Sequence, residues 1–441
     1  MMGETEKKCR EDEIARIVKQ VEAELRKELQ GEPGTLDDIE DEAQKIGERV
    51  KAIIERQRLK SKGHGFVGQH ARCRCGHRAR LRSEHVRRIT TQSGSRRITR
   101  SYYYCDSCRT GFCPLDEELG LVAGEFSLRV RGLASRFAGY VPYESASQEL
   151  REVLGVHVSA SSIRRIAMAS GKQLQVDFAV NQARLQRYEC DFSSDRYPKQ
   201  LHASMDGCMV MVNGQWQEVK TAVVYQRRNG KEHEIACADY YSSLAESSEF
   251  GPRMRTQAFL SGADHCRDVA MVGDGAKWIW QETAKHLPRA VQILDLYHVM
   301  DYVWEIANAS WGEKTQSART WAAEQKDLLL DDRVENVISS MKTWDPSSQE
   351  HEDLKRTTLG YFESNKGRML YKTFLAQGWH IGSGVMEAAN KAVVQQRMKR
   401  SGMRWEEQGA EAILQLRTAI VSSRKLDYRD LARRASASAY S

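Results

Sequence analysis

Three acidic residues, far apart in the chain, carry the side chains best suited to chemistry. Asp206 and Asp274 each close an apolar, β-rich run and precede a glycine, and Glu387 lies near the start of an expected helix. Three carboxylates gathered by folding can hold two divalent cations, which clamp the attacking and leaving oxygens of a phosphodiester. The sequence therefore predicts a catalytic centre in which Asp206, Asp274 and Glu387 bind two Mg²⁺, with Mn²⁺ as a substitute.

Each of these residues also has a simpler interpretation. Asp-Gly pairs are common in turns, and a glutamate near a helix start is favoured by the helix dipole. The strand context favours the catalytic interpretation for Asp206 and Asp274. For Glu387, only its combination with the two aspartates does so.

The elements that position these residues begin near Lys199. Asn213-Gly214 and Arg228-Asn229-Gly230 separate apolar runs, and Asn-Gly between such runs is a strong hairpin signal. The chain then alternates short apolar runs with helical patterns, which is typical of βα repeats in a mixed sheet. If the first strand is central and the fourth lies beside it, Asp206 and Asp274 are neighbours. The expected strands are 201–212, 215–225, 232–241, 268–273 and 290–296.

The whole chain is expected to be an α+β multidomain protein. Its core is a ribonuclease-H-like mixed sheet with helices, and a helical insertion loops out between Asp274 and Glu387. The expected domains are a helical N-terminal region (1–62), a zinc-ribbon-like module (63–115), a helical helix-turn-helix DNA-binding domain (116–190), the core (198–425) with its insertion at about 305–375, and a flexible tail (426–441).

Cysteines cluster in one segment. Five of the ten fall between Cys73 and Cys113, and the sequence lacks a secretion signal, which favours a metal site over disulfides. Cys105 and Cys108 have C-x-x-C spacing, whereas Cys73 and Cys75 are closer together than is usual. The prediction is one structural Zn²⁺ held by Cys73, Cys75, Cys105 and Cys108. His77 or Cys113 remains an alternative to Cys73, and a set of reduced core thiols is the simplest alternative.

The same segment is strongly basic. Between Arg72 and Arg100 there are ten arginines and one acid, Glu84, within a chain of net charge +7. Such a stripe repels itself unless an anion neutralises it, so we expect contact with nucleic-acid phosphates, with Arg87 and Arg88 among the contacts. A solubilising surface is the alternative, although such surfaces usually mix both signs.

A helix-turn-helix pattern follows. An amphipathic stretch at 145–154, a glycine turn and a second helix at 160–173 match the motif, although an ordinary helical hairpin gives the same pattern. A second basic run follows Glu387, where Trp405 either stacks on a base or is buried. The expected DNA-binding residues are Ser161, Ser162, Arg164 and Arg165 on the second helix, and Arg397, Lys399, Arg400 and Arg404 in the basic run.

The N-terminus has no apolar segment of the kind found in secretory signals, and no apolar run is long enough to cross a membrane. We therefore expect a cytoplasmic, nucleoid-associated protein with no membrane partner.

Several motifs carry a resemblance to a known family: Cys105-Asp106-Ser107-Cys108, Phe112 to Asp116, Met205-Asp206-Gly207, Gly273 to Ala276, Asp295 to Val299, and Ile381 through Glu387 to Trp405. Through them, residues 70–420 resemble the bacterial insertion-sequence transposases that have an Asp-Asp-Glu, ribonuclease-H-like core, most closely the Kra-type (ISKra) group. The sequence departs from the family pattern at Arg72, which stands where a C-x-x-C would need a cysteine.

The resemblance implies DNA cleavage and strand transfer at the ends of a mobile element. Asp206, Asp274 and Glu387 would hold the metals, and Asp295 and His298 match a D-x-x-H signature that supports the active site. The implied partners are double-stranded DNA, as terminal inverted repeats and target, and further copies of the chain on that DNA. Two alternatives remain: a domesticated DNA-binding regulator with a silent core, and a nuclease that only hydrolyses. For Asp295 and His298, the simpler interpretation is a strand-end turn with a capping or core histidine.

Overall fold

The structure is a computed structural model that describes residues 4–32, 34–187, 199–227 and 234–437. It divides into two compact units, which are described separately. The first comprises Met1–Ser170 with Asp427–Ser441, and the second comprises Gly171–Leu426.

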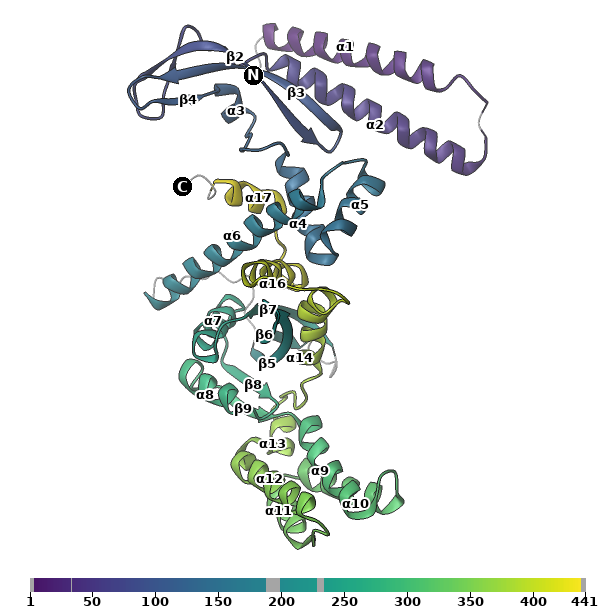
Figure 1. The fold of residues 1–441 in the computed structure, drawn as a ribbon, viewed down its shortest axis with the longest axis vertical. Helices are drawn as coiled ribbons and strands as arrows, with labels where there is room; N and C mark the ends of the chain where they lie inside the picture. Colours follow the sequence, from purple (N-terminus) through teal and green to yellow (C-terminus); the bar gives the residue numbers. More distant parts are fainter. Residues whose placement is uncertain (1–3, 33, 188–198, 228–233, 438–441) are drawn as a thin grey trace. The chain divides into compact units, whose positions relative to one another are not determined.

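The first unit begins with a helical hairpin and a small sheet (Figure 1). Its sheet is antiparallel, with strand order β1-β2-β3-β4. The elements are α1 (Glu4–Glu28), α2 (Leu36–Ser61), β1 (His70–Arg72), β2 (Arg78–Thr91), β3 (Gly94–Cys105), β4 (Thr110–Phe112), α3 (Pro114–Glu118), α4 (Leu128–Tyr140), α5 (Tyr143–Leu154), the first part of α6 (Ala160–Gln186) and α17 (Tyr428–Ala437).

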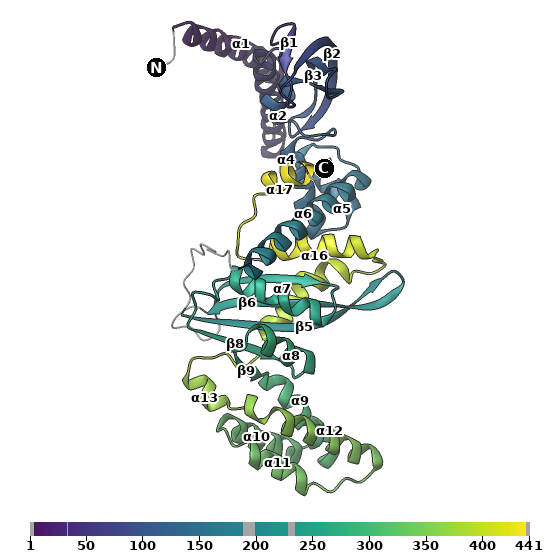
Figure 2. The ribbon, with the colours of Figure 1, turned by 90° about the vertical axis from the view of Figure 1, so that its left-hand side faces the viewer.

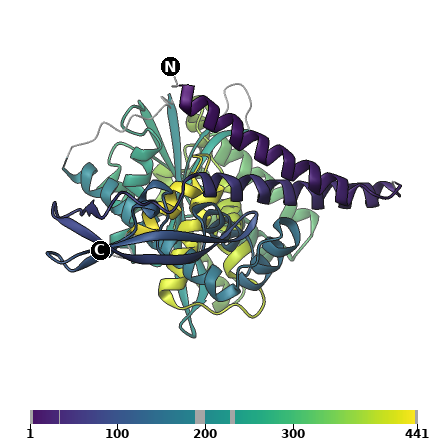
Figure 3. The ribbon, with the colours of Figure 1, turned by 90° about the horizontal axis from the view of Figure 1, so that it is seen from above.

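The helices α1 and α2 lie side by side, which confirms the expected N-terminal helices (Figure 3). Thr35 starts α2 with a capping box, in which its side chain and that of Asp38 each bond the other's backbone N–H. Arg49 of α2 forms ion pairs with Glu24 and Glu28 of α1. These contacts fix the pairing of the two helices.

The small sheet has one apolar face and one basic face. Ala71, Ala79, Tyr103 and Cys105 are buried together on the apolar face. On the opposite face, exposed basic side chains of β1 and β2 lie opposite one another, Arg72 with Arg78 and His70 with Arg80. Since the like charges of Arg72 and Arg78 directly opposite one another destabilise a sheet, this face gains from an external anion.

Helices α4, α5 and α6 follow the sheet. Gly155 ends α5 in the left-handed region with φ of 62°, and Val156 N–H then bonds to Leu150 O at 3.0 Å. The helix that follows, α6, is longer than predicted, because it continues past 173 to Gln186.

The expected flexible tail is wrong for most of its length, because Tyr428–Ala437 form the helix α17. Leu431, Ala432 and Ala435 are buried, and α17 packs on α4. Arg131 of α4 donates to Ser436 Oγ at 2.7 Å. The two helices approach closely at Gly132 of α4, where a Cβ would lie 3.0 Å from Tyr428 O.

The second unit is built on a mixed five-stranded sheet of order β7-β6-β5-β8-β9 (Figure 2). The expected placement of the fourth strand beside the first is thus confirmed. The elements are β5 (Gln200–Val212), β6 (Gln215–Arg227), β7 (Ile235–Ser243), α7 (Ser247–Leu260), β8 (Asp268–Gly273), α8 (Lys277–His286), β9 (Val291–Leu294), α9 (Leu296–Trp311), α10 (Gln316–Leu330), α11 (Val334–Thr343), α12 (Gln349–Asn365), the 3₁₀ turn η1 (Lys366–Arg368), α13 (Tyr371–Ala376), α14 (Gly384–Ala389), the π-helix η2 (Asn390–Gln395), α15 (Gln396–Met398) and α16 (Glu407–Val421).

Strands β5, β6 and β7 form the expected antiparallel meander. Asn213 and Gly214 both have positive φ, 51° and 77°, as the Asn-Gly hairpin requires. The second expected turn, at 228–230, lies outside the described residues. Among the described residues, no helix combines the length and apolar character needed to cross a membrane.

Candidate catalytic centre and cysteine cluster

Parallel pairing brings three aspartates to one edge of the sheet. The β5–β8 ladder pairs Ser204 with Val272, and the β8–β9 ladder pairs Val272 with Ile293. Asp206, Asp274 and Asp295 each lie two residues beyond these paired positions. Three neighbouring strands therefore present a carboxylate at the same level. This level is the end of β8 and of β9 but the middle of β5, so the expectation that Asp206 closes its strand is wrong.

Asp206 is half-buried, and its hydrogen bonds do not offset the cost of burying its negative charge. Its Oδ1 accepts Gly207 N–H at 2.7 Å, and its Oδ2 accepts Asn390 Nδ2 at 2.6 Å. Burial, reinforced by the negative charges of Asp274 and Glu218, raises the pKa of Asp206 to about 6 despite these two hydrogen bonds. A carboxylate in such surroundings gains from a nearby cation.

Asp274 is held by the turn that follows β8. Its Oδ1 accepts Ala276 N–H at 2.9 Å, and Tyr361 of α12 donates its hydroxyl to Asp274 O at 2.7 Å. Gly275 has φ of 100°, and a Cβ there would lie 2.6 Å from the Tyr361 ring. Glycine is therefore required at 275 both by the backbone and by this close approach.

Glu387 lies on α14, one turn before Asn390, and the helix then continues as the π-helix Asn390–Gln395. Its side chain is 68% exposed and lies 4.0 Å from Lys391 Nζ. Within the described part of the chain, no three carboxylates have oxygens within 4.8 Å of one another. The structure thus brings the helix of Glu387 to Asp206 through Asn390, but it does not bring the three predicted carboxylates together at metal-binding distance.

Asp295 is buried and links two elements of the site. It caps α9 by accepting Tyr297 N–H at 2.9 Å, and it also accepts the Ser383 hydroxyl at the start of α14. Burial raises the pKa of Asp295, and hydrogen bonds from Ser383 and Tyr297 oppose the shift. His298 is exposed, with Nδ1 3.9 Å from Asp301 Oδ2. Asp295 therefore lies in the strand-end turn of the simpler interpretation, but Asp295 itself caps the helix, and the exposed His298 is not a core histidine. The same carboxylate fixes the start of the Glu387 helix.

The predicted cysteine set forms one cluster. Ligand atoms of Cys73, Cys75, Cys105 and Cys108 all lie within 4.8 Å of one another, with Cys73–Cys108 at 3.5 Å and Cys75–Cys105 at 3.6 Å. For Zn–S bonds of about 2.3 Å, the four sulfurs of a tetrahedral site lie roughly 3.8 Å apart. The four thiols are therefore close enough together to hold one zinc ion.

The close spacing of Cys73 and Cys75 does not exclude Cys73 from the cluster. Gly76 has φ of 87°, and its N–H bonds to Cys73 O, so a tight turn brings both sulfurs to one side. Of the two proposed substitutes, Cys113 lies outside the cluster, and His77 Nδ1 is 3.5 Å from Cys75 Sγ. The Thr110 side chain and the thiols of Cys75 and Cys73 lower the pKa of Cys108, whereas the contacts of Cys75 with the other thiols raise the pKa of Cys75. These contacts therefore favour the thiolate at Cys108 and oppose it at Cys75.

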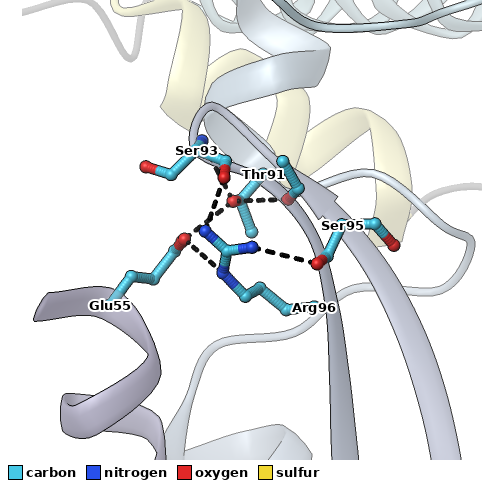
Figure 4. A network of polar contacts seen from close by, with 6 residues as sticks. Glu55, Thr91, Ser93, Ser95 and Arg96 are labelled. Carbon is cyan, nitrogen blue, oxygen red and sulfur yellow. Dashed lines mark hydrogen bonds and ion pairs between the residues drawn. The ribbon is translucent and has the colours of Figure 1, made fainter. Parts of the chain in front are cut away.

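The arginines between Arg72 and Arg100 separate into a group bonded within the chain and a group that is exposed. Arg87 belongs to the first group. Arg87 donates to Val122 O and to Gly124 O, so its predicted role as a phosphate contact is wrong. Arg100 pairs with Asp116. Figure 4 shows Arg96 bonded to Glu55 of α2, which also accepts the Thr91 hydroxyl. Carboxylates and carbonyls from distant segments neutralise these arginines.

The exposed arginines of the stripe include Arg88 and the three arginines of the basic face, which are Arg72, Arg78 and Arg80. These three arginines make no ion pair among the described residues. On α6, the predicted Ser161, Arg164 and Arg165 are exposed, and Ser162 is half-buried. Ser162 N–H bonds to Ser159 Oγ at 3.3 Å, so the start of α6 is internally ordered.

Arg397 is not a DNA-contacting residue, because only 1% of its surface is exposed. Its guanidinium lies over the Trp405 ring, 5.0 Å from the centroid. Trp405 is also buried and donates to Met398 O at 3.1 Å, so the base-stacking interpretation of Trp405 is wrong. Lys399, Arg400 and Arg404 are exposed, as a DNA surface requires.

Three residues at the candidate centre were not predicted. Asn390 follows Glu387 by three positions, and this helical spacing was a usable signal that the two residues lie on one side of the helix. Ser383 was visible only as part of a glycine-rich helix start. Tyr361 comes from a helix 87 positions after Asp274, and nothing local in the sequence marks it.

The chain belongs to the uncharacterised protein family UPF0236, whose profile matches residues 69–434. This match covers the small sheet, the helices α4–α6 and the whole mixed sheet. A search among curated proteins gave no match.

We predict that Cys73→Ser will lose zinc as completely as Cys105→Ser and Cys108→Ser, because all four sulfurs contribute to one site and metal binding there stabilises the fold. Metal analysis of the purified proteins should give about one zinc per wild-type chain. Cys113→Ser is the matched control and should keep its zinc. Full zinc retention in Cys73→Ser would show that another residue completes the site.

A second prediction concerns the pH dependence of stability. Because the folded-state pKa of Asp206 is raised to about 6 from 3.8, the carboxyl group destabilises the folded state increasingly as pH rises through this window. Without divalent cations, Asp206→Asn should raise the unfolding free energy at pH 8 by on the order of 1–2 kcal/mol more than at pH 4.5. Denaturant titrations at both pH values measure this, with Asp268→Asn, at the other end of the sheet, as control. An equal effect at both pH values would contradict it.

Proposed function

We propose that this protein is a metal-dependent transposase with a ribonuclease-H-like core, which binds the terminal inverted repeats of an insertion sequence and cleaves and transfers DNA strands. The observation that carries the proposal is the row of carboxylates Asp206, Asp274 and Asp295 on three neighbouring strands, together with the Glu387 helix attached to it through Asn390 and Ser383. The resemblance to Kra-type transposases supports it.

The donor set suits hard divalent cations. Carboxylate oxygens are the ligands Mg²⁺ prefers, and Asp206 is a partly desolvated carboxylate beside the charge of Asp274. When bound, two such ions would activate the attacking oxygen and stabilise the leaving one. Asp206 and Asp274 would provide the fixed side of the site, because hydrogen bonds orient both.

Glu387 would provide the metal ligand whose side chain can move into the site. Its carboxylate is exposed and interacts only at 4.0 Å with Lys391, so a change of side-chain rotamer costs little. Asn390 orients Asp206 and sets the distance between β5 and the helix. Asp295, through Ser383, fixes where that helix begins. His298 is exposed near this edge and is proposed as support for binding the scissile phosphate.

DNA contact is assigned to two surfaces. The basic face of the small sheet carries His70 and three arginines that form no ion pair with the residues the structure describes, which suits phosphates. The start of α6, with Ser161, Ser162, Arg164 and Arg165, suits base edges in the major groove, as in a helix-turn-helix. Arg88, Lys399, Arg400 and Arg404 are further exposed candidates, and the cysteine cluster would hold its zinc as a structural ribbon.

The alternatives differ in what the core does. A nuclease would hydrolyse DNA without joining it to a new strand, and a DNA-binding regulator would do neither. The electrostatic strain on Asp206 favours a working cation site over a silent core, since a silent core has no need to keep a poorly compensated buried carboxylate.

We predict that Asp206→Asn, Asp274→Asn and Glu387→Gln will each reduce Mg²⁺-dependent cleavage by at least about 10³-fold while sparing DNA binding, because each removes a charge the cations need. The assay measures cleavage of a terminal-repeat duplex and joining of its 3′-hydroxyl to target DNA. Asp268→Asn, at the opposite end of β8, is the matched control. Near wild-type cleavage by any of the three variants would remove that residue from the centre, and hydrolysis without joining would favour the nuclease.

DNA recognition should separate into two effects. Arg164→Ala or Arg165→Ala should reduce discrimination between terminal repeat and random DNA by about 1–3 kcal/mol for each lost base contact. The combined change of Arg72, Arg78 and Arg80 to Ala should weaken binding to both DNAs and lower the salt slope by about one unit per lost phosphate contact. Titrations on both DNAs at several salt concentrations test this, with the exposed Arg56→Ala as control. Unchanged preference in both α6 variants would reject α6 as the sequence reader.

A further inference from the structure

The hairpin of α1 and α2 leaves one stripe of α2 uncovered. Leu36, Ala43, Gly47 and Ile54 follow one another at steps of seven, four and seven residues, so they share one side of the helix. Leu36 is 70% exposed and Ile54 is 42% exposed. Ala43 is also exposed, and only Ile53 and Gln57 of α2 are buried. An apolar stripe of this length is open to solvent in the single chain.

No contact within the single chain explains why position 47, inside a helix, is glycine. It lies inside α2, where glycine costs roughly 0.5–1 kcal/mol relative to alanine. A Cβ built on it meets nothing within 4 Å, so no contact of the chain itself requires glycine there. Glycine beside Ala43 would instead allow the backbone of another helix to approach closely at this point.

The charges of α2 are separated along its length. Residues 36–48 carry six acids and one base, whereas residues 49–61 carry five bases and one acid. The packed helix α1 does not offset this, because its eight acids and seven bases are mixed along it. One end of α2 is therefore acidic and the other basic, on a helix whose open side is apolar.

Both patterns are symmetric about position 45. Leu36 and Ile54 lie nine residues to either side of it, and Ala43 and Gly47 lie two residues to either side. An antiparallel copy of α2 would set Leu36 against Ile54, Ala43 against Gly47, and each acidic half against a basic half. Such self-complementarity is what a two-fold interface requires.

We infer that α2 is the interface through which two copies of this chain associate, antiparallel and with their two-fold axis near Lys45. The small residues at the axis let the helices approach, Leu36 and Ile54 close the apolar contact at both ends, and Glu40 of one copy faces Lys51 of the other. Neither Glu40 nor Lys51 makes an ion pair within the described residues of its own chain. The inference holds whether or not the protein cleaves DNA.

The first test is the oligomeric state of the full chain without DNA. Sedimentation velocity over a range of concentrations should show a monomer–dimer equilibrium for the wild type. Gly47→Arg should be monomeric over the same range with unchanged helical circular dichroism, because the open space around Gly47 accommodates the side chain in one chain but not in the pair. Ala23→Arg, at an exposed alanine of α1, is the matched control and should dimerise normally.

A charge exchange tests the antiparallel register. Glu40→Lys and Lys51→Glu should each raise the dimer dissociation constant about tenfold, because two attractive pairs become repulsive. Mixing the two variants should restore near wild-type association, and so should the double variant alone. A monomeric wild type, a dimeric Gly47→Arg, or no recovery on mixing would each overturn the inference. Loss of DNA cleavage with dimerisation intact would instead count only against the proposed function.

Discussion

The parallel pairing of β5 with β8 is the constraint on which the candidate centre depends. It matches Ser204 to Val272, and β9 continues the same level through Ile293. Because side chains alternate along a strand, a slip of one residue would turn one aspartate to the other face of the sheet. The register is protected by burial, since Ala203, Met205 and Met271 are fully enclosed in the core of this unit.

The second requirement is that a distant helix meet this edge. The sheet alone does not fix the position of this helix. Two polar contacts do: Asn390 with Asp206, and Ser383 with Asp295. The π-helical segment starting at Asn390 widens the helix at the point of contact. Such segments are rare, cost hydrogen-bond geometry and occur frequently at functional sites. The irregularity is therefore better explained by the site than by the packing of the helix.

Much of this architecture was readable from the sequence. Apolar, β-rich runs separated by turns such as Asn213-Gly214 predicted the meander, and the expected ribonuclease-H-like topology predicted that β8 lies beside β5. Asp274 was identified because the end of its strand is visible locally, and Asp206 because an Asp-Gly pair interrupts an apolar run, although β5 continues past it. Tyr361 was not, because its contact with Asp274 depends on how an inserted helix returns to the sheet. The tail at 428–437 was misjudged because its few apolar residues stabilise a helix only when α4 covers them.

The basic residues show most clearly that the sequence alone does not reveal long-range contacts. In the sequence, Arg87, Arg88, Arg96 and Arg397 are equivalent members of basic runs. In the fold, Arg87 bonds to carbonyls near 122–124, Arg96 is neutralised by Glu55, and Arg397 lies beneath Trp405. Only long-range contacts decide which arginines keep an unneutralised charge at the surface. Since affinity for a polyanion depends strongly on those charges, the like-charged pair of Arg72 and Arg78 supports the proposed nucleic-acid surface better than the number of arginines in the stripe does.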